Sequence, residues 1–376
     1  MGHKTVSPTQ NMNHPENDPQ HIGLTVNAGV SQAPIVNPYF IPKRKKKTLS
    51  VNDYVEGILK GDISTLAQAV TLVESNLPEH QQVAQQIIEC CLPHANATIR
   101  LGITGVPGAG KSTFIEALGM HLATQGKKLA VLAIDPSSER TKGSILGDKT
   151  RMAALSASQN AFIRPSPSAG SLGGVARKTR ESIVLCEAAG FDTIFVETVG
   201  VGQSETAVHS MVDFFLMLQI SGAGDELQGI KRGIMEMVDG VAINKCDGTN
   251  VTKAKVTRSQ IQNALHLFPA SESGWIPQVK TCSSVEGNGI TQIWDMITEY
   301  TQSVKASGYF EKKRTAQSRY WMYESINEQL KNNFYHNPTI QQLLEANERR
   351  VLNNEISSFV AANQLLDQYE KHIKSF

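Results

Sequence analysis

The sequence has little net charge, few cysteines and no long apolar run, and each of these absences excludes a class of protein. Its 36 basic and 35 acidic residues leave a net charge of +1, which argues against a nucleic-acid binder working through bulk charge. No apolar stretch reaches the roughly 18 residues needed to span a bilayer, so we expect no membrane association. The N-terminus lacks an apolar signal core, and the absence of arginine from residues 1–40 disfavours a mitochondrial presequence.

The cysteines show no C-x-x-C spacing, which predicts reduced, mostly buried thiols of a cytoplasmic protein. Apolar residues make up 40% of the chain and charged residues 19%, as expected for a soluble globular protein. The cysteines are Cys90, Cys91, Cys186, Cys246 and Cys282.

What the sequence does contain is the stretch G-V-P-G-A-G-K-S-T, which fits the phosphate-binding pattern G-x-x-x-x-G-K-[ST]. Glycine lets successive backbone N–H groups approach phosphate oxygens, and the following helix points its positive end at them. Lys111 suits the β- and γ-phosphates, and the Ser112 hydroxyl suits Mg²⁺. A strand pattern before the loop and a helical pattern over Ser112–Gln125 disfavour the alternative, an ordinary glycine-rich turn. The predicted nucleotide-binding residues are Gly105, Val106, Pro107, Gly108, Ala109, Gly110, Lys111, Ser112 and Thr113.

Residues 98–304 alternate between apolar strand patterns and helical patterns, which predicts an α/β fold. We expect a P-loop NTPase with a mostly parallel, doubly wound sheet, flanked by N-terminal and C-terminal helical extensions. Ligands of such sheets bind at the carboxyl ends of the strands. Strands are predicted over Ile99–Thr104, Lys128–Asp135, Ala161–Arg164, Thr193–Thr198, Phe214–Ile220, Val241–Asn244 and Gln278–Cys282. Helices between them are predicted over Val175–Ala189, Leu227–Met237, Thr257–Leu267 and Ile290–Gln302.

Composition divides the chain into four regions. Residues 1–47 are polar, lack periodicity and end in the basic run K-R-K-K-K, so we interpret them as a disordered tail with a solvated basic linker. Residues 48–96 form a predicted N-terminal helical domain, and residues 97–304 the P-loop domain. Residues 305–376 form a predicted C-terminal helical arm.

The two helical regions carry their own signals. Ser50 is a predicted cap for a helix over Val51–Lys60. In the arm, amphipathic helices are predicted over Tyr309–Tyr335 and Thr339–Tyr369. Their apolar faces need a partner, which is either their own domain or, as we favour, a second copy in a homodimer.

The run V-A-I-N-K-C-D ends a predicted strand and contains N-K-x-D, the guanine-reading element of P-loop GTPases. The Asp247 carboxylate can accept hydrogen bonds from guanine N1–H and from the exocyclic amine. Adenine lacks this donor pair, and the unpaired carboxylate would cost about 1–3 kcal/mol. The alternative is a surface turn. The predicted guanine-binding residues are Asn244, Lys245 and Asp247, with Ser283, Ser284 and Val285 in a loop behind the base.

Acidic residues follow two further strands. Glu197, in E-T-V-G, can hold the Mg²⁺ shell, and Gly200 can donate its N–H to the γ-phosphate. Asp135 and Asp148 follow the second strand and could serve the metal or its bound water; their alternative role is loop capping. The candidate catalytic residues are therefore Lys111, Asp135, Asp148 and Glu197, and the candidate metal ligands are Ser112, Asp135, Asp148 and Glu197.

No arginine is clearly placed to stabilise charge in the transition state, since Arg140 and Arg151 are only candidates. Gln203 is a weaker candidate for orienting water. We therefore expect slow intrinsic hydrolysis that a partner accelerates.

Taken together, the motifs of this chain resemble the methylmalonyl-CoA mutase-associated GTPases, also called the MeaB/ArgK family. This family belongs to the glutamate-bearing class of P-loop metallochaperone GTPases. The resemblance covers roughly Leu66–Tyr300, and the run Glu139–Lys142 departs from the family pattern. The motifs that carry it, in order, are Gly105–Thr113, Asp135–Ser138, Gly143–Met152, Arg164–Pro167, Glu197–Glu205 and Gly224–Met237.

The resemblance implies a homodimeric GTPase that uses Mg²⁺ with GTP or GDP and chaperones an adenosylcobalamin-dependent mutase, by default methylmalonyl-CoA mutase. It implies that the protein gates cobalamin delivery and protects or reactivates the mutase. Gln228 and Lys231 match the family's third switch loop, which couples nucleotide state to the client; the alternative is an ordinary helix N-terminus. No D-x-H-x-x-G motif is present, so we expect cobalamin on the partner.

Three other functions remain open. A nickel-insertion GTPase needs metal-binding cysteines or a histidine-rich tail, and the histidines His3, His14 and His21 are scattered. An ATPase or kinase linked to basic amino-acid transport conflicts with Asp247. A nucleotide-locked adaptor would not hydrolyse GTP, and the acidic candidates Asp135, Asp148 and Glu197 argue against that function.

Overall fold

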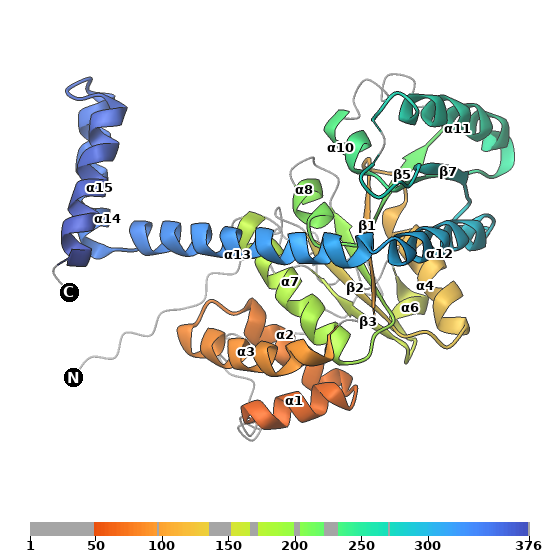
Figure 1. The fold of residues 1–376 in the computed structure, drawn as a ribbon, viewed down its shortest axis with the longest axis horizontal. Coiled ribbons are helices and arrows are strands. Elements are labelled where there is room, and N and C mark those ends of the chain that lie inside the picture. The colour runs from red at the N-terminus through yellow and green to blue at the C-terminus, as the bar shows by residue number, and fades with distance from the viewer. Residues whose placement is uncertain are drawn as a thin grey trace, which may run out of the picture. The chain divides into compact units, whose positions relative to one another are not determined.

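The structure, a computed structural model, describes residues 49–95, 98–134, 152–165, 172–198, 204–221, 232–269 and 271–374. Its centre is a seven-stranded sheet in the order β3-β2-β4-β1-β5-β6-β7, with parallel pairing throughout (Figure 1). The predicted parallel α/β fold is therefore confirmed. The strands are β1 (Ile99–Gly105), β2 (Leu129–Ile134), β3 (Ala161–Arg164), β4 (Thr193–Thr198), β5 (Phe214–Ile220), β6 (Gly240–Asn244) and β7 (Gln278–Thr281).

Each predicted strand matches an observed one, with ends that agree to about one residue, because long apolar runs bounded by turn signals are the clearest strand signal. The helices of the sheet region are α4 (Lys111–Thr124), α6 (Ala153–Ser156), α7 (Leu172–Ala188), α8 (Ser204–His209), α10 (Arg232–Met237), α11 (Val251–Leu265) and α12 (Ile290–Ala306). The helical regions on either side contain α1 (Val51–Leu59), α2 (Ile63–Glu74), α3 (Pro78–Cys91), α13 (Tyr309–Tyr335), α14 (Pro338–Leu352) and α15 (Ser358–Lys374).

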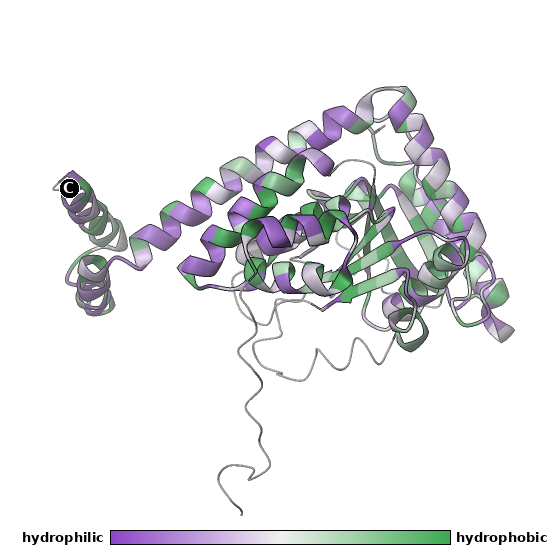
Figure 2. Cartoon of the chain, turned by 90° about the horizontal axis from the view of Figure 1, so that it is seen from below, coloured by the Kyte–Doolittle hydropathy of each residue, from purple (hydrophilic) through white to green (hydrophobic). Residues whose placement is uncertain are grey.

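Helices cover both faces of the sheet. Apolar residues of α4, α6 and α12 pack on one face, and those of α7, α8, α10 and α11 pack on the other. Figure 2 shows hydrophobic strands enclosed by helices with hydrophilic outer sides. Both faces of each central strand are thus buried, which explains why these strands are apolar runs without alternation.

The N-terminal helices share the core on the α7 face of the sheet. Ile58, Leu66 and Ile87, one from each of α1 to α3, are fully buried in the same cluster as the apolar side of α7. The predicted cap of α1 is confirmed: the Ser50 hydroxyl accepts from the Asp53 N–H at 3.2 Å, and the Asp53 carboxylate accepts from the Ser50 N–H at 2.9 Å. This reciprocal pair is a capping box.

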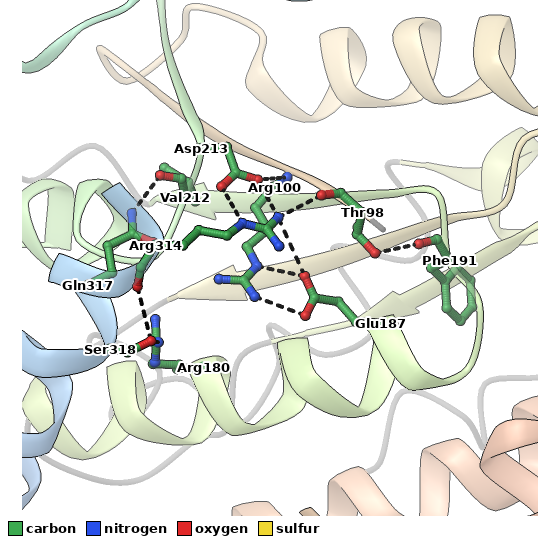
Figure 3. A network of polar contacts seen from close by, with 10 residues as sticks. All are labelled: Thr98, Arg100, Arg180, Glu187, Phe191, Val212, Asp213, Arg314, Gln317 and Ser318. Atoms are coloured by element: carbon green, nitrogen blue, oxygen red, sulfur yellow. Dashed lines mark hydrogen bonds and ion pairs between the residues drawn. The ribbon is translucent and has the colours of Figure 1, made fainter. Parts of the chain in front are cut away.

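A buried polar network holds helix α13 to the amino-terminal ends of the strands (Figure 3). Arg314 donates to both carboxylate oxygens of Asp213, at 2.9 and 2.8 Å, and to the Thr98 carbonyl at 2.6 Å. Asp213 also accepts from the backbone N–H of Arg100 at 2.8 Å, and the Arg100 guanidinium pairs with Glu187 of α7 at 2.7 and 2.9 Å. The network therefore joins α13 to β1, to α7 and to the residue before β5.

The same side of α13 binds the turn that connects α8 to β5. Gln317 donates to the Val212 carbonyl at 2.8 Å, and the Trp321 indole N–H donates to the Ser210 carbonyl at 3.0 Å. These donors lie one helical turn apart and so face the same way. The first half of α13 thus packs on its own domain, the alternative that we disfavoured for this stretch.

The prediction of one helix over Thr339–Tyr369 is wrong, because the chain forms α14 and α15 with a turn between them. Asn354 adopts a left-handed conformation with φ 56°. Its N–H donates to the Val351 carbonyl at 3.0 Å, and the Glu355 N–H donates to the Arg350 carbonyl at 2.9 Å. This pairing is a Schellman motif, which ends a helix, and asparagine tolerates the required conformation better than most residues.

We predict that Arg314→Met will lower the free energy of unfolding by about 3 kcal/mol, because it leaves the buried Asp213 carboxylate without its cation. The measurement is chemical denaturation followed by tryptophan fluorescence. Arg319→Met, on an exposed face of the same helix, should stay within about 0.5 kcal/mol of wild type. Equal effects of the two substitutions would contradict the anchoring role of Arg314.

Candidate functional site

The phosphate-loop pattern lies between β1 and α4, at the carboxyl end of a central strand. Glycine is required in this loop for two reasons: a Cβ atom would not fit at Gly105, and the φ angles of Gly108 and Gly110 are positive. A Cβ on Gly105 would lie 2.4 Å from the Leu218 carbonyl oxygen of β5, and Gly108 and Gly110 have φ values of 79° and 85°. Gly110 caps α4 in the left-handed region. The loop is therefore held against β5 in the conformation that turns backbone N–H groups toward an anion.

Lys111 is positioned over this loop. Its Nζ donates to the Gly105 carbonyl at 2.8 Å. Burial lowers the pKa of Lys111, while the charges of Glu197 and Glu205 act in the opposite direction. Phosphate oxygens close to this ammonium would favour its charged form, so the buried lysine suits a polyphosphate ligand.

The side chains of Ser112 and Glu197 lie close together on the α4 face of the sheet. The Ser112 hydroxyl lies 3.4 Å from Glu197 Oε1, because β4 is paired with β1 in a register that places Glu197 beside Ile103. The two groups are oxygen donors, the ligand type that Mg²⁺ prefers. These two candidate metal ligands are thus brought together at the edge of the phosphate loop.

Asn244 connects the phosphate loop to the predicted guanine loops. Its Nδ2 donates to the Ala109 carbonyl at 2.8 Å. Its Oδ1 accepts from the Ser284 N–H at 3.1 Å, from the Ser284 hydroxyl at 2.8 Å and from the Cys282 thiol at 3.6 Å. With 2% of its surface exposed, Asn244 is a buried structural link between three loops.

Asp247 is aimed by the loop after β7. The Ser283 hydroxyl donates to Asp247 Oδ2 at 2.6 Å and accepts from the Glu286 N–H at 3.2 Å. Ser283 is completely buried, whereas Val285 is 83% exposed. Lys245 has φ 58°, an uncommon angle for a residue with a side chain, which turns the chain between β6 and Asp247. One carboxylate oxygen is thus fixed by Ser283, which orients the carboxylate for a base.

Comparison with known proteins identifies the family of this chain. The family model described as "Methylmalonyl Co-A mutase-associated GTPase MeaB" matches residues 66–339. The chain belongs to this family. It is 47% identical to "GTPase ArgK" of Escherichia coli (strain K12), over 83% of this chain and 94% of that one.

Two further relatives support the family assignment. The "Methylmalonic aciduria type A homolog, mitochondrial" of Mus musculus is 44% identical, over 86% of this chain and 81% of that one. A solved structure described as "LAO/AO transport system kinase" is 40% identical, with a TM-score of 0.68, and covers 85% of this chain and 97% of that one. The chain is a GTPase with the P-loop fold.

Several residues predicted for this GTPase site lie outside the residues that the structure describes, so their roles stay predictions. The described site consists of the phosphate loop, Glu197 and the two guanine loops. Among the described residues, no helix is both long enough and apolar enough to cross a bilayer. The predicted residues outside the described ranges are Asp135, Asp148, Gly200, Gln203, Gln228 and Lys231, together with the arginine candidates Arg140 and Arg151.

Sequence reasoning gave no role to Glu205, which the structure places near the phosphate loop. It lies in the first turn of α8 with 2% of its surface exposed, and its charge acts on Lys111. The sequence contained it within the motif E-T-V-G-V-G-Q-S-E. Its burial depends on α8 packing over β1 and β4, which no local pattern reveals.

We predict that Ser283→Ala will weaken GTP and GDP binding about fivefold, or roughly 1 kcal/mol, because the Asp247 carboxylate loses the hydrogen bond that orients it. ATP binding, which does not use Asp247, should be unchanged. Displacement of a fluorescent GDP analogue measures these affinities. Ser303→Ala, at an exposed position of α12, is the control. Unchanged GTP affinity of Ser283→Ala would show that Ser283 does not orient Asp247.

Proposed function

We propose that this GTPase is a chaperone of an adenosylcobalamin-dependent acyl-CoA mutase, with methylmalonyl-CoA mutase as the default client. In this role it gates delivery of the cobalamin cofactor and protects or reactivates the mutase. The observation that carries the proposal is the family match over residues 66–339, whose description names a mutase-associated GTPase. The name of the mouse relative, which refers to methylmalonic aciduria, supports the same client.

The nucleotide proposed for the site is GTP or GDP with Mg²⁺. Ser112 and Glu197 would hold the ion, together with Asp135 and Asp148, and Lys111 would hold the β- and γ-phosphates. The metal would supply neutralisation of charge on the phosphates. Lys111, Asp135, Asp148 and Glu197 are the proposed catalytic residues. Cobalamin would stay on the mutase, and Gln228 and Lys231 would transmit the nucleotide state to it.

A homodimer through the C-terminal arm is part of this proposal. Several large apolar side chains of the arm are exposed to solvent, among them Leu352 at 81%, Phe359 at 80% and Leu366 at 51%. Phe359 and Leu366 lie on α15 two turns apart, at a spacing that puts them on one side of the helix. An apolar stripe of this kind is stabilised when a second copy covers it.

The alternatives receive less support. Nickel insertion needs metal-binding cysteines or a histidine-rich tail, and His3, His14 and His21 are scattered in the sequence. The solved relative is described as a kinase, and that description applies to that protein alone. For this chain, the carboxylate of Asp247 held by Ser283 favours guanine over adenine.

The decisive measurement is steady-state GTP hydrolysis with and without the organism's purified methylmalonyl-CoA mutase, with ATP as the control nucleotide. We expect slow hydrolysis alone and acceleration of tenfold or more by the mutase, because a partner can supply a charge that stabilises the transition state. Gln228→Ala and Lys231→Ala should keep the basal rate and lose the acceleration. Lys111→Ala should be inactive in both conditions. Absence of acceleration with GTP still preferred would reject this client and leave the GTPase assignment intact.

We predict that Phe359→Glu will convert the dimer into a monomer, because a charge would be buried at the proposed contact. Size-exclusion chromatography with light scattering measures the mass. Leu267→Glu is the matched control, since Leu267 is 87% exposed at the end of α11 and outside the arm. A wild-type protein that is monomeric, or a Phe359→Glu variant that stays dimeric, would overturn the assignment of the arm.

A further inference from the structure

The backbone ladder between β1 and β4 ends where their functional residues begin. Their backbone pairing ends at Ile103 and Glu197. Beyond this pair, β1 continues along β5 as far as Gly105, and β4 continues along β2 as far as Thr198. The two strand ends that carry the phosphate loop and the Glu197 segment therefore have no backbone hydrogen-bond ladder between them.

A pair of buried hydroxyls spans this gap. Thr198 Oγ1 donates to Thr104 Oγ1 at 3.0 Å, and the exposed fractions of the two residues are 1% and 2%. Thr104 directly precedes Gly105, the first glycine of the phosphate loop, and Thr198 directly follows Glu197. The bond thus links the residue before the phosphate loop to the residue after Glu197.

The threonine pair lies behind the site, away from the phosphates. Successive strand residues point to opposite faces, and Glu197 reaches Ser112 on the α4 face. Thr198 therefore points to the α8 face. Gly102, which shares the face of Thr104, agrees with this placement, because a Cβ there would lie 2.9 Å from Val208 of α8. Both threonine side chains thus lie on the face of the sheet opposite to the Ser112–Glu197 contact, so we expect any effect on turnover to act through their neighbours.

We propose that the Thr104–Thr198 hydrogen bond positions Glu197 against the phosphate loop during GTP hydrolysis. Thr104 and Thr198 are positioning residues. The proposal concerns the hydrolysis itself and does not depend on which client the GTPase serves. Thr198 stays paired with Ile134 of β2, so loss of the bond allows only a small shift of Glu197 relative to the phosphate loop. Small displacements of this kind reduce turnover far more than binding.

The test separates positioning from simple stability. Thr104→Val and Thr198→Val each leave one buried hydroxyl unpaired, so each should lower the Tm. The double variant removes both hydroxyls and should recover most of that loss, because replacing both partners by apolar groups is nearly neutral. Positioning predicts that kcat of the double variant stays about tenfold below wild type although its Tm recovers. The affinity for GDP should remain within twofold in all three variants.

Two further variants complete the design. Thr198→Ser keeps the hydroxyl and should retain a kcat near that of wild type. Thr193→Val is the matched control, because Thr193 lies on the same strand, is 1% exposed, and has a hydroxyl with no hydrogen-bond partner among the described residues. It should leave kcat unchanged.

The outcomes are distinct. A double variant with wild-type Tm and wild-type kcat would overturn the proposal and leave the pair a purely structural contact. An equal loss of kcat in Thr193→Val would also overturn it. If a single variant does not fold, the double variant and Thr198→Ser provide the same comparison.

Discussion

The hydrogen bond from Asn244 to the Ala109 carbonyl fixes the distance between the two halves of the nucleotide site. One half is the phosphate loop after β1, and the other is the base-reading segment after β6. A side chain that spans two strand ends in this way works only if β5 alone separates those strands, which is the observed order. A Cβ on Gly110 would lie 2.9 Å from the same Asn244 amide, so the loop glycine and the asparagine constrain each other.

The two ends of the sheet carry different kinds of polar group. At the carboxyl ends, Lys111, Ser112 and Glu197 converge around the phosphate loop, with 3.4 Å between the Ser112 hydroxyl and Glu197 Oε1. At the amino ends, Arg314 and Asp213 form a closed network with short, bidentate bonds. The charges at the second end hold α13 to the sheet, whereas those at the first end surround the loop that fits a phosphate group.

Helix α13, the first helix of the C-terminal arm, contacts the turn after α8. Helix α8 begins at Ser204 soon after the Glu197 strand, and the turn after it is bound by Gln317 and Trp321 of α13. The helix that leads to the proposed dimer contact is thus joined to the part of a GTPase that commonly changes with nucleotide state. A chaperone that couples hydrolysis to a client needs a connection of this kind.

The sequence by itself determined the phosphate loop, the N-K-C-D segment and the strand positions, because these depend on local composition and period. It also contained the Asn353–Asn354 signal that ends α14, which the helical pattern around it concealed. The tertiary structure alone decided the burial of Glu205, the pairing of Arg314 with Asp213, and the contact of Thr104 with Thr198. Those partners lie 101 and 94 residues apart in the last two cases. Contacts at such separations follow from strand order and register, which the apolar pattern of a strand does not encode, since a buried strand presents the same pattern to any neighbour.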